Sequence, residues 1–219
     1  MKKLNEFGRS MVEMLGVLAI IGVLSAGALA GYSKAMMQHR LNKHTDEISY
    51  LLATVIYNSD KLKDASRDMI DELSALGAFT WDIKSFRYDT TTEGKNTHFY
   101  DSLNNLTWFE HDTNQTSTAF CVWLPDSDYQ IQVCRNYINI FKNLADELDM
   151  IYVTKAQGKA RMRNTYVGKT CTSEKCLKTM TNQDIIDICQ THCTDADHCI
   201  LYALFGYPAS TVQNLLNSQ

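Results

Sequence analysis

A long uncharged run near the N-terminus is the strongest hydrophobic signal in the chain. Residues 14–33, MLGVLAIIGVLSAGALAGYS, carry no charged side chain over 20 positions. At about 1.5 Å of rise per helical residue, such a run spans roughly 30 Å, the hydrocarbon thickness of a bilayer. Lys2, Lys3 and Arg9 precede the run and Lys34 follows it. The pattern predicts a membrane-spanning helix, with a buried core helix as one alternative and a secretory signal or signal anchor as another.

Apolar residues continue at helical spacing beyond this run. They are Met37, Leu41, Ile48, Leu52 and Val55. Charged residues stand between them, so this second part is amphipathic. The pattern predicts one helix from about residue 9 to residue 57, apolar all round in its first half and one-sided in its second. Two helices with a break near Gly31 are the alternative.

The middle of the chain changes from helical to strand-like patterning. A second helix is expected over about 60–76, with Gly77 as its C-terminal cap. Short runs rich in Trp, Tyr, Phe and Thr between 79 and 133 are typical of antiparallel strands. A further helix over 136–150 and a short strand over 150–154 follow. The predicted fold class is therefore α+β.

One hairpin is defined more closely than the rest. Residues 119–124 and 129–134 are predicted to be two strands on either side of a turn at 125–128. That register places Cys121 opposite Cys134, and directly opposed residues have Cβ atoms close enough for a disulfide. We expect a Cys121–Cys134 disulfide, with two buried thiols as the alternative if the register slips by one residue.

Seven cysteines are present, and the odd number leaves at least one without an intramolecular disulfide partner unless a metal binds several. Five of them cluster near the C-terminus: Cys171, Cys176, Cys189, Cys193 and Cys199. A capping-box pattern from Thr181 to Asp184 opens a helix there, which puts Cys189 and Cys193 one turn apart. Disulfides are expected in an oxidising compartment and a zinc site is the alternative, although the spacing fits no common zinc module.

Composition limits the functional classes. With 21 basic and 25 acidic side chains, the net charge is −4, which argues against a general nucleic-acid binder. A basic stretch over 155–169 is expected to be a solvated loop, with a DNA-binding surface as the alternative. The six histidines are scattered, and no nucleophile motif or glycine-rich phosphate loop is present. We predict no enzyme activity, no cofactor and no metal.

The residues Gly8-Arg9-Ser10-Met11-Val12-Glu13-Met14-Leu15 resemble the class III signal of type IV pilins and type II secretion pseudopilins. The resemblance covers roughly the first 35 residues. It implies that prepilin peptidase cleaves after Gly8 and that Arg9 becomes the N-methylated first residue. Arg9 stands where the family commonly has Phe or Met, and the helix-kinking proline of many pilins is absent, with Ala30 in that neighbourhood.

Glu13 supports this interpretation on physical grounds. A carboxylate at the edge of a membrane span costs a few kcal/mol unless it is paired, so an acid there suggests a function. In a helical filament, the N-terminal amine of one subunit would meet the Glu13 carboxylate of its neighbour. Because that pair forms only on assembly, it would drive docking and fix the axial register.

The resemblance implies a division of the chain into leader, spine, head and tail. These would be residues 1–8, 9–58, 59–170 and a cysteine-rich 171–219. The protein would be a structural subunit of a pilus or pseudopilus, anchored in the bacterial inner membrane with its head outside the cytoplasm. Its partners would be other pilin-like subunits, prepilin peptidase, the inner-membrane assembly platform and membrane lipid. The alternative is a membrane-anchored extracytoplasmic binding module that does not polymerise.

Overall fold

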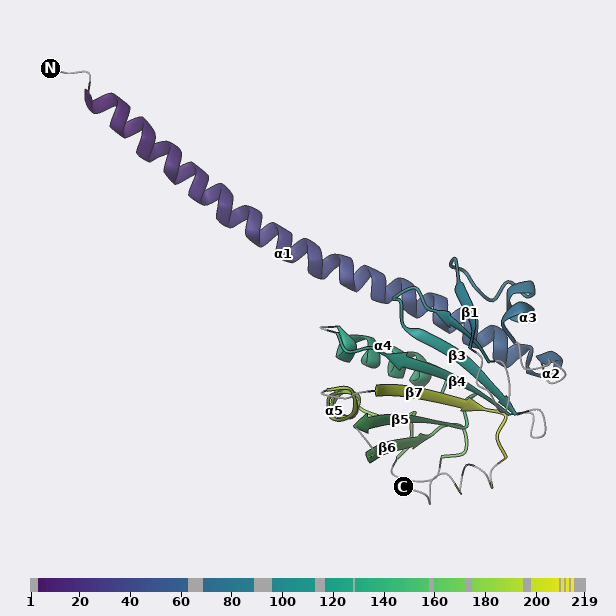
Figure 1. The fold of residues 1–219 in the computed structure, drawn as a ribbon. Coiled ribbons are helices and arrows are strands. Elements are labelled where there is room, and N and C mark those ends of the chain that lie inside the picture. The colour runs from purple at the N-terminus through teal and green to yellow at the C-terminus, as the bar shows by residue number, and fades with distance from the viewer. Residues whose placement is uncertain are drawn as a thin grey trace. The chain divides into compact units, whose positions relative to one another are not determined.

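The computed structural model of the chain describes residues 4–62, 69–88, 96–112, 117–127, 129–157, 160–171, 175–194 and 198–208, together with residues 210, 212 and 214. The chain divides into two compact units, Met1–Asn42 and Lys43–Gln219. A single 54-residue helix, α1 (Leu4–Tyr57), contributes to both (Figure 1).

Helix α1 runs without interruption through Gly27 and Gly31. The prediction of one continuous helix is therefore confirmed, and the alternative of a break near Gly31 is wrong. In the second unit α1 buries one face, and the members of that face are at most 1% exposed: His44, Ile48, Leu51, Leu52 and Val55. Their spacing follows the helical period, which is why the amphipathic pattern was visible in the sequence.

Within the described residues, seven antiparallel strands form one sheet in the order β1-β2-β3-β4-β7-β5-β6 (Figure 1). The strands are β1 (Lys84–Tyr88), β2 (Asn96–Tyr100), β3 (Leu106–Asp112), β4 (Ser117–Leu124), β5 (Met150–Gln157), β6 (Ala160–Val167) and β7 (His198–Phe205). The last strand, β7, lies between β4 and β5. The cysteine-rich tail therefore supplies a central strand of the head.

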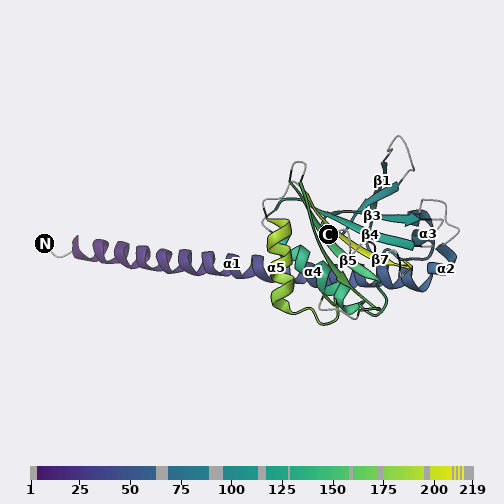
Figure 2. The ribbon, with the colours of Figure 1, turned by 90° about the horizontal axis from the view of Figure 1, so that it is seen from below.

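Two helices, α4 (Gln130–Asn143) and α5 (Asn182–Cys193), lie on the same side of this sheet (Figure 2). The ring of Phe120 on β4 lies 6.2 Å from that of Tyr137 and 6.3 Å from that of Phe141, both on α4. Phe109 on β3 continues the aromatic contact, 5.2 Å from Phe120. Side chains alternate between the two faces of a strand, so Ala119 and Cys121, which flank Phe120 on β4, face away from α4.

The predicted hairpin over 119–134 is wrong in its second half. Residues 119–124 do lie in β4, but the chain then enters α4 at Gln130 instead of a strand. Val133, Tyr137 and Phe141 are buried one turn apart along α4. The polar–apolar alternation over 129–134 spans only six residues, a length at which strand and helix patterns cannot be told apart.

The basic stretch over 155–169 is also not a loop. Its residues complete β5 and form β6, which pair as a hairpin from Met150 opposite Val167 to Gln157 opposite Ala160. The predicted short strand over 150–154 is thus present and longer than expected. The sequence pattern did not predict this hairpin, because an antiparallel strand can carry charged side chains on a face that is not packed on the core.

Shorter helices and caps complete the head. The helix expected over 60–76 corresponds to α2 (Ser59–Leu62) and α3 (Met69–Ala75). Gly77 follows α3 with a φ of 68°, and Ala78 N–H donates to the Leu73 carbonyl, as in a Schellman cap. The predicted capping box at the start of α5 is present, with the Thr181 side chain accepting from Asp184 N–H.

Candidate functional site

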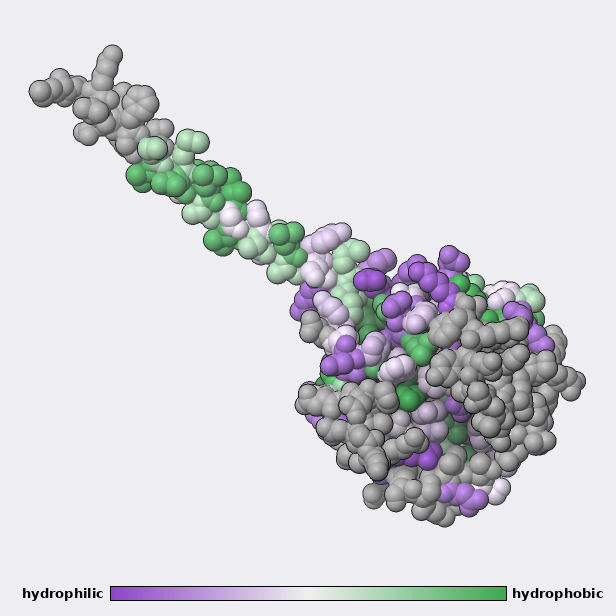
Figure 3. Space-filling view, viewed as in Figure 1, coloured by the Kyte–Doolittle hydropathy of each residue, from purple (hydrophilic) through white to green (hydrophobic). Residues whose placement is uncertain are grey.

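The first candidate site is the apolar surface of α1 in the first unit. Twelve large apolar side chains between Met11 and Tyr32 are each 52–74% exposed. Figure 3 shows this surface as a mostly green length of helix. Within the described residues, only α1, in the stretch Met11–Tyr57, is long and apolar enough to cross a membrane, and none of its most apolar window is buried. Burying one such side chain is worth about 1.5–3 kcal/mol, so the surface favours an apolar environment outside the chain.

Glu13 lies within this surface, two residues after its first apolar residue, and its side chain is exposed. Gly8 and Arg9 lie one turn earlier in α1, and their side chains fall outside the described residues. The structure therefore places a carboxylate on an otherwise apolar helix surface. No other acidic or basic side chain occurs from Met14 to Ser33.

Four glycines on the same helix have space around them: Gly16, Gly22, Gly27 and Gly31. A Cβ built on any of them meets nothing within 4 Å. No contact within the described chain therefore requires glycine at these positions, although each glycine weakens a helix by about 1 kcal/mol relative to alanine.

The second candidate is a buried polar network in the head, centred on Asp101. One carboxylate oxygen, Oδ2, lies 2.9 Å from His44 Nε2 and accepts hydrogen bonds from Tyr137 Oη and from Asn105 Nδ2, the latter at 2.7 Å. The other, Oδ1, accepts from the backbone N–H groups of Leu103 at 2.9 Å and Asn105 at 2.7 Å. The network joins α1, the β2–β3 turn and α4.

The other ring nitrogen of His44, Nδ1, also has a hydrogen-bond partner. Asn136 Nδ2 on α4 donates to His44 Nδ1 at 2.9 Å, and Thr45 Oγ1 donates to Asn136 Oδ1 at 2.9 Å. His44 Nε2 donates to the Asp101 carboxylate. A histidine on the buried face of a helix was the only sign of the network in the sequence.

Burial and hydrogen bonding act in opposite directions on Asp101. Burial alone would raise the pKa of its carboxyl, but the hydrogen bond and charge of His44, with hydrogen bonds from Tyr137 and Asn105, lower that pKa below its ordinary value. Burial, and then the neighbouring Asp101 charge, raise the pKa of Tyr137 well above its ordinary value. His44 and Tyr137 are 0% exposed, so the network has no room for a substrate and fastens α1 to the head.

Three disulfides link the described elements of the head. Cys134 on α4 pairs with Cys189 on α5, Cys193 at the end of α5 pairs with Cys199 on β7, and Cys171 pairs with Cys176. The tail cysteines are thus disulfide-bonded, as expected. They leave no tail thiolate for the alternative zinc site, and His192 Nδ1 is hydrogen-bonded to the carbonyl of Ile188 in its own helix at 3.1 Å.

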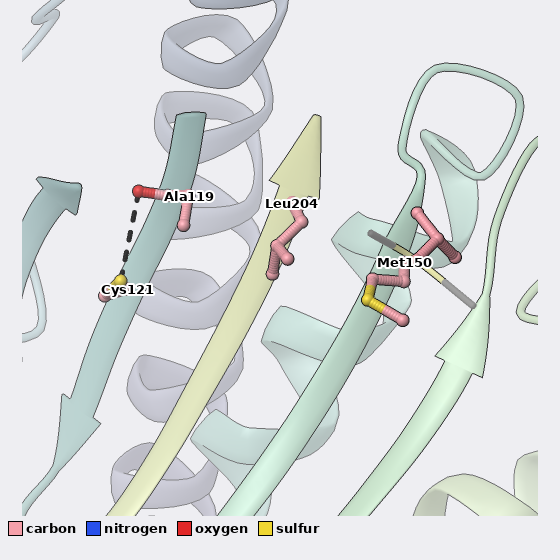
Figure 4. Close-up of a cluster of buried hydrophobic side chains, with 5 residues drawn as sticks. Ala119, Cys121, Met150 and Leu204 are labelled. Atoms are coloured by element: carbon pink, nitrogen blue, oxygen red, sulfur yellow. Dashed lines mark hydrogen bonds between the residues drawn. The ribbon is translucent and has the colours of Figure 1, made fainter. Parts of the chain in front are cut away.

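The predicted Cys121–Cys134 disulfide is wrong. Cys121 is a free, buried thiol on β4, packed with Ala119, Met150 and Leu204 (Figure 4). Its neighbour Phe120 contacts α4, so alternation along β4 turns Cys121 to the opposite face of the sheet from Cys134. Burial, and then the charge of Glu110, raise the pKa of the Cys121 thiol well above its ordinary value.

Several basic residues of the 155–169 stretch contact other groups of the head. Lys155 Nζ donates to the Thr194 carbonyl at 2.8 Å, and Lys169 Nζ lies 2.8 Å from the buried carboxylate of Asp149. Arg163 lies over the ring of Tyr152, 3.8 Å from its centroid. These contacts give no particular support to a DNA-binding surface.

Comparison with known proteins finds no matching family model, no matching curated protein and no matching solved structure.

Proposed function

We propose that this protein is a pilin-like or pseudopilin-like structural subunit, which inserts into the inner membrane through α1 and then polymerises through the same helix. The observation that carries the proposal is the uncovered apolar length of α1, continuous with a second length that is buried in a folded head. A membrane covers the apolar surface before assembly, and the α1 helices of neighbouring subunits cover it afterwards.

Processing would place a positively charged group where it can pair with Glu13 of a neighbouring subunit. Cleavage after Gly8 by prepilin peptidase makes Arg9 the first residue, with its α-amino group at the start of the helix. A carboxylate in an apolar region costs a few kcal/mol, and an ion pair with the amine of a neighbouring subunit would offset part of that cost. Glu13 therefore favours the assembled state and sets the position of one subunit along the next.

The glycines of α1 support the same proposal. Gly27 and Gly31 lie one turn apart and have open space where a side chain would be. Small residues at this spacing let membrane helices approach closely. The open positions are where a neighbouring α1 would pack in the filament.

The head supports an extracytoplasmic location. Disulfides persist in oxidising compartments, and three are present among the described residues. The Asp101 network and the buried face of α1 fasten the head to the second half of the helix. A head held this way is displayed on the filament surface, where it would serve adhesion, motility or secretion.

The alternative function is a membrane-anchored binding module whose helix is only a tether. Substitution of Glu13 separates the two functions. We expect Glu13→Ala and Glu13→Gln each to reduce sheared filaments by about tenfold or more, with membrane insertion unchanged, because neither side chain carries the charge for an ion pair with the amine. Asp46→Ala is the matched control, an exposed acid on the same helix beyond the apolar run.

Two results would oppose the proposal. One is filament yield in both Glu13 variants equal to that of the Asp46→Ala control, which a simple tether would give. The other comes from N-terminal sequencing of mature protein: the proposal requires Arg9 as the first residue, and a first residue at Gly31 would instead indicate an ordinary signal peptide.

A further inference from the structure

One disulfide of the head passes over the cysteine that is nearest in the chain. The nearest cysteine to Cys134 is Cys121, 13 positions away, yet Cys134 pairs with Cys189 at a separation of 55. The Cys134–Cys189 disulfide also encloses both members of the Cys171–Cys176 disulfide. Cys121 is left as the unpaired thiol.

An unfolded chain would favour the other partner. The entropic cost of closing a loop grows as (3/2)RT ln n, so a separation of 13 closes about nine times more readily than one of 55. In a chain that is oxidised before it folds, Cys134 therefore meets Cys121 more often than Cys189. The order of synthesis adds to this preference, because Cys189 is made after the other two.

The folded head cannot accommodate the Cys121–Cys134 disulfide. Cys121 is 0% exposed among Ala119, Met150 and Leu204 on one face of the sheet. Cys134 is 0% exposed on α4, which packs on the other face. β4 is an internal strand paired to both β3 and β7, so a chain cross-linked between these two cysteines cannot complete this part of the sheet.

We propose that the native Cys134–Cys189 disulfide is reached by thiol–disulfide exchange from a Cys121–Cys134 disulfide, which makes this chain a substrate for a thiol–disulfide isomerase. A disulfide oxidant of the compartment first oxidises the Cys121 and Cys134 thiols and is itself reduced to a dithiol. Cys189 then loses its proton to water, and its thiolate attacks Cys134 Sγ. The Cys134–Cys189 bond forms, the Cys121–Cys134 bond breaks, and Cys121 leaves as a thiolate that takes up a proton.

Folding makes this exchange directional. The exchange itself conserves the number of disulfides, so it needs no further oxidant. Once Cys121 is released, it packs into the buried cluster on β4, where the raised pKa keeps it protonated. The thiolate is the nucleophile in such reactions, so a buried protonated thiol cannot attack the new disulfide. Cys121 acts as a temporary partner for Cys134 until Cys189 arrives.

Oxidative refolding of the full chain tests this route. Reduced, denatured protein in detergent is refolded with oxidised and reduced glutathione, and samples are alkylated at intervals and their disulfides mapped by mass spectrometry. At the earliest times we expect Cys121–Cys134 to exceed Cys134–Cys189 by about ninefold, with the ratio reversing as the head folds. A purified disulfide isomerase should accelerate the reversal. Cys134–Cys189 exceeding Cys121–Cys134 at every time would overturn the proposal.

Variants separate the exchange from general folding defects. In Cys121→Ala the temporary partner is absent, so Cys134–Cys189 should form with less delay and with little acceleration by the isomerase; an unchanged delay would count against the route. Cys121→Val is made in parallel because it fills more of the buried space than alanine. The double variant Cys171→Ser/Cys176→Ser is the matched control: it removes a disulfide outside the exchange and should leave the early ratio unchanged. The wild-type measurement does not depend on any variant folding.

Discussion

Replacing Asp101 by Asn tests the buried network at its most connected group. The carboxylate accepts five hydrogen bonds, three at Oδ2 and two at Oδ1. An Asn amide must turn its NH₂ group toward one of these two sets of donors. The less costly choice points the NH₂ group at the two backbone N–H groups that donate to Oδ1. Those two donors then lose their acceptor, and each buried donor without an acceptor costs about 1–3 kcal/mol. After local relaxation we expect Asp101→Asn to lower the free energy of unfolding by about 2–4 kcal/mol.

Urea unfolding of the full chain in detergent measures this change. The three tryptophans are Trp81, Trp108 and Trp123, so their fluorescence reports on the head. For a chain of this size, about 2–4 kcal/mol corresponds to a fall in Tm of roughly 5–15 °C. Asp146→Asn is the matched control, because the ion pair of Asp146 with Lys178 joins side chains that are 74% and 67% exposed. Such a pair is worth about 0–1 kcal/mol.

The pH dependence adds a second measurement. Since the pKa of Asp101 is lowered in the folded state, its stabilisation is present above the ordinary carboxyl pKa of about 3.9 and is lost as the pH falls through the lower folded value. The stability gap between wild type and Asp101→Asn should therefore stay constant from about pH 8 to pH 5 and shrink below about pH 4. Equal stability of the Asp101→Asn and Asp146→Asn variants, or a gap that widens in acid, would refute the reasoning.

Two further predictions concern backbone geometry and capping. Gly168→Ala should lower the free energy of unfolding by about 3 kcal/mol or more, because a Cβ there lies 2.0 Å from the carbonyl oxygen of Leu148. Gly77→Ala should lower it by only about 1–2 kcal/mol, because Gly77 has a φ of 68° but open space around it. Urea unfolding of both variants checks the order, and a larger loss for Gly77→Ala would contradict it. Thr181→Ala removes the cap of α5 and should cost about 1 kcal/mol in the same assay. It should also raise the pKa of Asp184, which a hydrogen bond with the Thr181 side chain lowers; an unchanged pKa in an NMR titration would contradict that cause.

The parts of the fold that the sequence predicted are those set by long repeated patterns. The apolar run and its amphipathic continuation extend over many helical turns, so α1 was predicted close to its observed end at Tyr57. The capping box at Thr181 and the glycine cap at Gly77 were also visible, because each depends on residues within a few positions. The second strand of the predicted hairpin, over 129–134, is wrong because six residues hold too little periodicity to separate strand from helix.

The parts that the sequence did not predict depend on contacts between distant residues. His44, Asp101 and Tyr137 are separated by 57 and 36 positions, and nothing local marks them as partners. The β5–β6 hairpin was not predicted because of its many charged residues. The position of β7 between β4 and β5 likewise depends on pairing across the whole head.

The incorrect Cys121–Cys134 prediction has a physical meaning of its own. It depends on proximity along the chain and on local strand propensity, and the same two factors govern which residues meet before the chain folds. The native pair depends instead on contact between α4 and α5, two helices that lie far apart in the chain. The same local preference that misled the sequence prediction should therefore bring Cys121 and Cys134 together first, and long-range packing should then replace that disulfide with Cys134–Cys189.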